Sequence, residues 1–203
     1  MLLFSHIGLT IGAAIVIKRV YSLNRNRAQQ KASAITAHAS TSAIPNVNAS
    51  LQGLFDLRWW ITGSILPDII DKPLGFFLFN NGRIYSHTLL FAVLIFTAGL
   101  CLALSHRKKW LLGLSFGIFI HLILDFIWLN PQTFLWPFQG LYFPSYDNSN
   151  WLADIFQGLF NNPLIYIPEI TGLLITAAFT WKLVHGKYLL RFIKYGEMPV
   201  NLV

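Results

Sequence analysis

Long apolar stretches alternate with short polar ones along the chain. Four of the apolar stretches run for about 17 to 22 residues, close to the length that a helix needs to cross a bilayer. They are Met1–Ile17, Thr88–Leu104, Trp110–Leu129 and Pro163–Val184. A fifth stretch, Leu51–Ile70, is charged near both ends and is predicted to span as a short or partly re-entrant helix. The pattern therefore predicts an all-α polytopic membrane bundle of about five transmembrane or partly re-entrant helices.

Composition agrees with a membrane protein. Of the 203 residues, 55% are hydrophobic and only 11% are charged, about half the charge of an ordinary soluble domain. No repeat or second domain is evident, so residues 1–203 are expected to form one membrane-embedded domain. Within it, residues 24–50 are predicted to be a polar cytoplasmic loop and residues 130–162 an aromatic, outer interfacial segment. The net charge of +7 forms no basic stripe interleaved with aromatics, so we expect no nucleic-acid partner.

Positive charge orients the predicted helices. In a five-helix arrangement with the N-terminus outside, nearly all basic residues fall on the cytoplasmic side, as the positive-inside rule requires. They are Lys18, Arg19, Arg25, Arg27, Lys31, Arg58, Arg107, Lys108, Lys109, Lys182, Lys187, Arg191 and Lys194. Only Lys72 and Arg83 remain opposite. Because Lys18 and Arg19 follow the first apolar stretch, we interpret it as a retained helix of an inner (plasma) membrane protein whose C-terminus is cytoplasmic.

Ionisable residues near the predicted outer ends are the most informative feature. His121 and Asp125 lie four residues apart in one apolar stretch, so their side chains project from the same helical face. A charge at the centre of a membrane helix costs roughly 2.5–3.5 kcal/mol on insertion scales, which makes such groups functional candidates. The five-helix arrangement brings the following residues to one depth: His6, Asp68, Asp71, His87, His121, Asp125 and Glu169. A shared metal ion explains this common depth.

Each of these residues also has a structural interpretation. A lone membrane histidine such as His6 is usually a hydrogen-bonding partner between helices. Asp68 and Asp71 can end or cap a helix, and Glu169 can stabilise a first helical turn through the helix dipole. These interpretations account for the residues one at a time and leave their common depth unexplained, so we favour the metal site.

Two other functions share this pattern of residues. Transporters and proton relays also place histidines and carboxylates inside the membrane. They need polar groups at successive depths, whereas this sequence concentrates them in one layer. A membrane scaffold whose helices are merely tied together by a metal ion is the second alternative, and the sequence does not show the coordination number that would distinguish it.

Several motifs follow one another in an ordered series. They are His6, Gly63-Ser-Ile-Leu-Pro67-Asp68-Ile-Ile-Asp71, Arg83-Ile-Tyr-Ser86-His87, His121-Leu-Ile-Leu-Asp125 and Thr133-Phe-Leu-Trp-Pro137-Phe138. In order and spacing they resemble the YdjM-type family of LexA-regulated, membrane-bound metal-dependent hydrolases. The resemblance extends from Met1 to about Gly172 and reaches distantly to the zinc-dependent phospholipase C and P1 nuclease group. The family often has His-Arg where this chain has Gly82-Arg83, and Pro-Asp-x-Asp where it has Pro67-Asp68-Ile-Ile-Asp71.

The resemblance implies a set of metal ligands. Asp68, His87, His121 and Asp125 would hold one ion, and Asp125 would bridge to a second ion that His6 also binds. The later His-His-Glu set of the phospholipase group has no counterpart before His185. We therefore expect one or two divalent ions, zinc in the first place, with Glu169 as a substitute ligand.

Such a site points to hydrolysis. Zinc lowers the pKa of a bound water toward about 7, and a second ion can hold the oxygens of a phosphoryl group. Asp68 or Asp71 is expected to orient the water or act as base, and Arg83 either binds a phosphate oxygen or anchors a headgroup. With an aromatic segment beside the bilayer surface, the expected partners are membrane lipids and the expected substrate a lipid or lipid-linked phosphoester.

Overall fold

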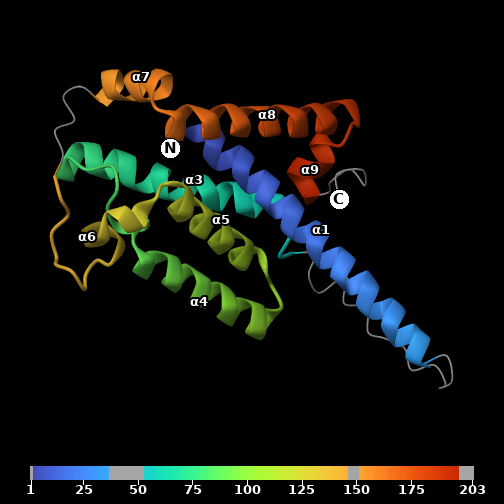
Figure 1. Ribbon diagram of the computed structural model, residues 1–203. Coiled ribbons are helices and arrows are strands. Elements are labelled where there is room, and N and C mark those ends of the chain that lie inside the picture. Colours follow the sequence, from blue (N-terminus) through green and yellow to red (C-terminus); the bar gives the residue numbers. More distant parts are fainter. Residues whose placement is uncertain (1, 37–52, 146–150, 197–203) are drawn as a thin grey trace.

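The computed structural model describes residues 2–36, 53–145 and 151–196, and every regular element in these ranges is helical. The five main helices are α1 (Leu3–Thr36), α3 (Leu57–Leu74), α4 (Leu89–His106), α5 (Trp110–Leu124) and α8 (Pro163–His185) (Figure 1). The shorter elements are η1 (Gly75–Phe79), η2 (Tyr85–His87), η3 (Ile127–Leu129), α6 (Pro131–Phe134), α7 (Trp151–Asn161) and α9 (Leu189–Tyr195). The predicted all-α class is confirmed.

Three of the described helices have the length and apolar composition needed to cross a membrane. They are the Leu3–Gln30 part of α1, the whole of α4 and the whole of α8. Helix α5 is apolar but has only 15 residues, and α3 carries Asp68, Asp71 and Lys72 within its 18 residues. The structure thus supports a polytopic membrane protein, and five complete crossings remain a prediction.

The first helix is longer than predicted. Residues 24–36 continue α1 to Thr36, so this part of the predicted polar loop is wrong; residues 37–50 of the loop lie outside the described residues. The reason is local propensity, because from Leu23 to Thr36 the chain has no Gly or Pro and is rich in Ala, Gln, Arg and Lys. Polarity was mistaken there for irregular structure.

Helix α5 is shorter than predicted. It ends at Leu124 with Asp125 as its C-cap, and Phe126 follows with a left-handed φ of 50°. The residues up to Leu129 form the separate turn η3, so a continuous helix from Trp110 to Leu129 is wrong. The break turns the chain away just after Asp125, so this buried carboxylate lies at the end of α5.

The interfacial segment is partly helical. Residues 130–162 contain the short helix α6 and the 11-residue helix α7, and residues 146–150 lie outside the described part. Both elements lie toward the end of the bundle where α8 begins (Figure 1).

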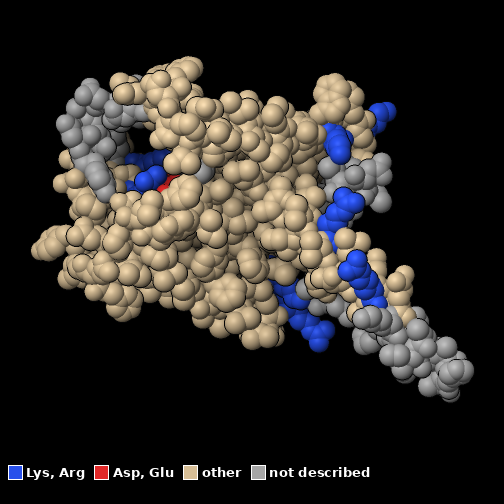
Figure 2. Space-filling view, in the orientation of Figure 1, with Lys and Arg blue, Asp and Glu red and all other residues tan. Residues whose placement is uncertain are grey.

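The helices are arranged so that their predicted outer ends meet. Helix α3 packs against α5, α5 against α4, and α1 against both α8 and α3. Figure 1 shows the starts of α1, α4 and α8 and the ends of α3 and α5 at the same end of the bundle. Most of the visible Lys and Arg side chains lie toward the opposite end, where α4 and α8 finish (Figure 2). The bundle therefore has one strongly basic end and one end where the candidate ligands converge.

Glycines set the closest helix crossings. A Cβ on Gly63 of α3 would overlap the carbonyl oxygen of Leu114 in α5, and a Cβ on Gly117 of α5 would overlap the carbonyl oxygen of Trp60. Gly8 and Gly172 form a second contact of this kind between α1 and α8. Small residues allow helix backbones to approach this closely. The two crossings bring together the four helices that surround the candidate site.

We expect Gly117→Ala to destabilise the bundle. The new methyl group must push α3 away from α5, and overpacking of this kind costs roughly 1–3 kcal/mol. Thermal unfolding of the purified protein would measure the loss. Gly12→Ala is the matched control, because the nearest atom to a Cβ there is a flexible Ile175 methyl at 3.5 Å. Equal melting temperatures for the two variants would contradict the crossing as a structural constraint.

Candidate metal centre

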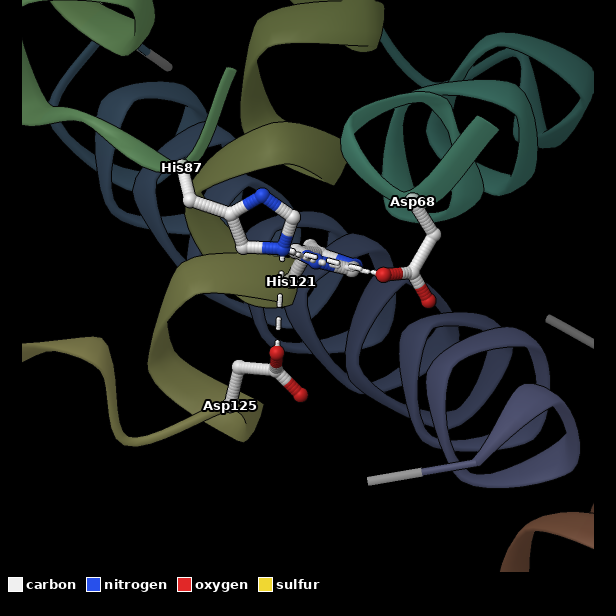
Figure 3. Close-up of side chains that lie close together, drawn as sticks. All are labelled: Asp68, His87, His121 and Asp125. Carbon is white, nitrogen blue, oxygen red and sulfur yellow. Dashed lines mark hydrogen bonds and ion pairs between the residues drawn. The ribbon is translucent and has the colours of Figure 1, made fainter. Parts of the chain in front are cut away.

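Four side chains converge at the end of the bundle where α3 and α5 finish. Asp68 comes from the second half of α3, His87 from η2, His121 from the last turn of α5 and Asp125 from the cap of α5. One ligand atom of each lies within 4.8 Å of the ligand atoms of the other three. Figure 3 shows the two imidazole rings and the two carboxylates directed toward a common point. Elements distant in sequence thus build a single cluster.

The outer nitrogens of both histidines are held by acceptors. Nδ1 of His87 lies 2.7 Å from Oδ2 of Asp71, and Nδ1 of His121 lies 2.7 Å from the backbone oxygen of Ser64. A carboxylate and a carbonyl can only accept, so both Nδ1 atoms carry the hydrogen and donate. In the neutral rings the lone pair is then on Nε2, the atom that faces the cluster.

The inner nitrogens have the separation of two ligands on one ion. The Nε2 atoms of His87 and His121 are 3.1 Å apart, and two nitrogens on a tetrahedral ion at 2.0–2.1 Å would be about 3.3 Å apart. Oδ1 of Asp68 lies 3.7 Å and 4.0 Å from these nitrogens, and Oδ2 of Asp125 lies 3.7 Å from that of His87. Two lone pairs facing each other beside two carboxylates fit a divalent cation such as zinc.

Basic side chains pair with both aspartates of the cluster. Lys72 Nζ lies 2.7 Å from Asp68 Oδ2, and Arg83 Nε lies 2.8 Å from Asp125 Oδ2. His87 precedes α4 and lies outside the three candidate spans. Burial lowers its pKa, but the hydrogen bonds and charges of Asp68 and Asp71 outweigh burial, so the pKa of His87 is above its usual value. The surroundings of this imidazole favour a positive charge, which a bound cation would supply.

Comparison with known proteins decides the family. A family model described as YdjM inner membrane protein matches residues 1–193. The chain belongs to this family. No curated protein and no solved structure matches it. This match confirms the resemblance of the motifs to the YdjM family, and the family's description agrees with the three apolar helices in indicating a membrane protein.

Asp71 holds the backbone around the YdjM-family cluster. It is fully buried, and its carboxylate accepts hydrogen bonds from the backbone nitrogens of Ile84, Ser86 and His87 as well as from the His87 ring. The side chain therefore fixes the 84–87 turn and the orientation of His87. This geometry supports positioning of a ligand and differs from the predicted role of orienting or deprotonating water.

His6 lies beside the four-residue cluster. Its ring stacks on that of His121 with centroids 4.2 Å apart, and its Nε2 lies 3.3 Å from Oδ1 of Asp125. The side chain is buried, and in the described part of the chain neither ring nitrogen has a hydrogen-bond partner. An unsatisfied buried imidazole next to a carboxylate oxygen fits the predicted second cation, with Asp125 between the two positions.

Glu169 has a different role from the predicted one. Its two carboxylate oxygens accept hydrogen bonds from the backbone nitrogens of Phe4 and Ser5, at 2.9 Å and 3.0 Å. These nitrogens belong to the first turn of α1, whose N–H groups have no partner within the helix. The geometry makes Glu169 a cap for α1 and leaves it out of the four-residue cluster. The sequence suggested that Glu169 interacts with the dipole of its own helix, α8. In the structure its carboxylate interacts with the dipole of α1.

Two contributors were missed from the sequence. The carbonyl oxygen of Ser64 orients His121, and no residue type signals a backbone acceptor of this kind. Lys72 was noted only as a basic residue on the outer side, although its spacing of four from Asp68 on one helix is a recognisable ion-pair signal. Arg83 lies beside the cluster, with its side chain 40% exposed and its Nε bonded to Asp125.

We expect Asp71→Asn to weaken metal binding by roughly 10–100-fold, the usual loss when a residue that orients a metal ligand is changed. The asparagine amide has the shape of the aspartate side chain but carries no negative charge, so it is a weaker acceptor for the Nδ1 hydrogen of His87. Competition with a chromogenic chelator would measure the affinity. Asp56→Asn, a change in the cap of α3 far along the helix, is the control and should bind metal normally. An unchanged affinity for the metal in Asp71→Asn would contradict the positioning role of Asp71.

Proposed function

We propose that this protein is a membrane-bound metal-dependent hydrolase that acts on a lipid or lipid-linked phosphoester. The observation that carries the proposal is the pair of histidine Nε2 atoms 3.1 Å apart, flanked by two aspartates. Both rings are already oriented through Nδ1, which is the arrangement of metal-ligating histidines. The family's membrane location and the apolar surroundings of the cluster support a lipid substrate.

One or two divalent ions fit the residues. Asp68, His87, His121 and Asp125 would hold the first, and His6 with Oδ1 of Asp125 would hold the second. Two imidazoles and two carboxylates form a donor set that suits zinc. When bound, a divalent ion makes water a nucleophile at neutral pH and stabilises negative charge on a phosphoryl group.

The chain's own residues supply the remaining functions. The side chain of Asp68 is 17% exposed while that of Asp125 is 3% exposed, so Asp68 is the cluster carboxylate most accessible to water. We assign it the role of orienting the water and accepting its proton, besides its contact with the cation. Arg83, held by Asp125, presents its remaining N–H groups to a phosphate oxygen.

Large apolar and aromatic side chains are exposed on the segments that follow α3 and α6. Phe77 and Leu78 of η1 are 79% and 70% exposed, and Phe138 and Tyr142 of the interfacial segment are 85% and 91% exposed. Beneath them a cluster of aromatic rings packs edge to face or stacked: Phe79, Tyr85, Trp136 and Phe143. Exposed aromatics at a helix end are typical of the membrane interface. A lipid with its headgroup at this level can reach the cluster while its acyl chains stay in the bilayer. If the basic end of the bundle is cytoplasmic, this lipid is in the outer leaflet.

The distribution of buried ionisable groups favours a hydrolase over a transporter. In the described ranges these groups are His6, Asp71, His87, His121, Asp125 and Glu169. All come from the helix ends that meet at the cluster, and they do not form a series through the bundle (Figure 1). A relay requires such a series.

Protein purified without chelators or a histidine tag is expected to contain one to two equivalents of a divalent metal and to release phosphate or a phosphorylated headgroup from lipid phosphoesters. His121→Ala and Asp125→Ala should lose the metal and fall to the activity of chelator-treated protein. His185→Ala is the control, since His185 is exposed near the end of α8. Elemental analysis and a phosphoester screen are the measurements. Metal bound with no hydrolysis of any lipid phosphoester would favour the scaffold, and no metal would refute the site.

A further inference from the structure

Two cations at the rim of the metal centre are used by neither helix packing nor metal binding. Lys72 Nζ contacts Oδ2 of Asp68 at 2.7 Å, and Arg83 Nε contacts Oδ2 of Asp125 at 2.8 Å. Their side chains are 58% and 40% exposed, so both reach the surface. They are also the two basic residues that the charge pattern leaves at the end opposite to all others.

The backbone brings the stem of Lys72 close to the peptide that carries Arg83. A Cβ on Gly82, the residue before Arg83, would lie 3.8 Å from Cγ of Lys72, so the stem of the lysine passes next to the 82–83 peptide. Asn81 holds Arg83 in turn, because its Oδ1 accepts from the Arg83 backbone nitrogen at 2.9 Å while its Nδ2 donates to the Pro144 oxygen at 2.7 Å. Figure 2 shows basic and acidic atoms together inside a recess at this end of the molecule.

Charge at this rim favours an anion. The carboxylates of Asp68, Asp71 and Asp125 would be balanced by one divalent ion together with one of the two cations. One positive charge then remains, and more remains if a second ion binds. A surplus of positive charge at the surface attracts anions and raises their local concentration.

We propose that Lys72 and Arg83 form a phosphate clamp that selects a terminal phosphate, so that the substrate is a lipid phosphate monoester or terminal diphosphate and not a phosphodiester. This inference rests on the proposed function. A terminal phosphate has three non-bridging oxygens, one more than a diester, and can therefore meet the lysine, the arginine and the metal centre together. Arginine presents a fixed fork of donors and lysine a compact point charge, a combination suited to phosphate.

The reaction that follows is a simple hydrolysis. The oxygen of water forms a bond to the terminal phosphorus, and the bond from that phosphorus to its bridging oxygen breaks. The bridging oxygen belongs to the lipid in a monoester and to the inner phosphate in a diphosphate, and it receives a proton of water through Asp68. The products are a lipid alcohol, or a lipid monophosphate from a diphosphate, and inorganic phosphate. No atom is oxidised or reduced.

Binding of inorganic phosphate to the metal-loaded, full-length protein in nanodiscs tests the clamp without relying on turnover. Isothermal titration should show Lys72→Gln binding phosphate at least about tenfold more weakly, the loss expected for one charge-assisted hydrogen bond. Lys72→Arg should restore most of the affinity, and dimethyl phosphate, a diester mimic, should bind more weakly than phosphate to the unchanged protein. Lys108→Gln, an exposed change in the turn after α4, is the control. Metal content is measured in every variant, and titrations are made at saturating metal.

The outcomes separate this inference from the proposed function. Equal phosphate affinity in Lys72→Gln and the unchanged protein, or tighter binding of dimethyl phosphate than of phosphate, would overturn the clamp while leaving hydrolysis of lipid phosphoesters intact. Phosphate binding that depends on Lys72, with no product from any lipid phosphoester, would support the anion site and refute the hydrolase. Faster turnover of a lipid phosphate monoester than of the matching diester, with KM raised in Lys72→Gln, would support both.

Discussion

The close crossing of α3 over α5 at Gly63 and Gly117 is the constraint on which the rest of the site depends. With no side chain at either position the two backbones come into contact. The carbonyl of Ser64, the residue after Gly63, then reaches Nδ1 of His121, one helical turn beyond Gly117. One turn further along α3, Asp68 faces the same point. A packing contact between two glycines thus determines the orientation of a ligand and the distance to another.

Burial of so many ionisable groups is tolerated because most of them have a defined partner. Asp71 binds the 84–87 turn, Glu169 binds the first turn of α1, and Lys72 and Arg83 form ion pairs with the cluster aspartates Asp68 and Asp125. Among the ionisable groups in the described ranges, the Nε2 atoms of His87 and His121 face each other beside the cluster aspartates, and neither ring nitrogen of His6 has a hydrogen bond. Since unsatisfied buried polar atoms are costly, these three imidazoles mark where positive charge is needed. The metal position therefore follows from what the rest of the fold leaves unsatisfied.

The main apolar helices and the end at which the ligands meet could be predicted from the sequence. The length of an apolar stretch and the distribution of Lys and Arg around it are properties of whole segments, so they do not depend on individual contacts. Thr88–Leu104 and Pro163–Val184 are close to α4 and α8, and the spacing of His121 and Asp125 correctly indicated one face. The end of α1 was wrong because polar residues with good helix propensity continue the helix beyond the apolar stretch. Glu169 was misassigned because its partners are backbone groups of α1, 164 and 165 residues away. Hydrogen bonds to backbone groups that tertiary packing brings together cannot be recognised from the local sequence. For the same reason the sequence did not indicate the contact of Ser64 with His121 or the positioning role of Asp71.

Anomalous diffraction from crystals of the full-length protein, recorded on both sides of the absorption edge of the bound metal, tests the central claim most directly. The structure predicts a peak between Nε2 of His87 and Nε2 of His121, within coordination distance of Asp68 and Asp125, and places any second peak between His6 and Asp125. An anomalous map with no peak among these four residues, from crystals shown by elemental analysis to contain the metal, would contradict it.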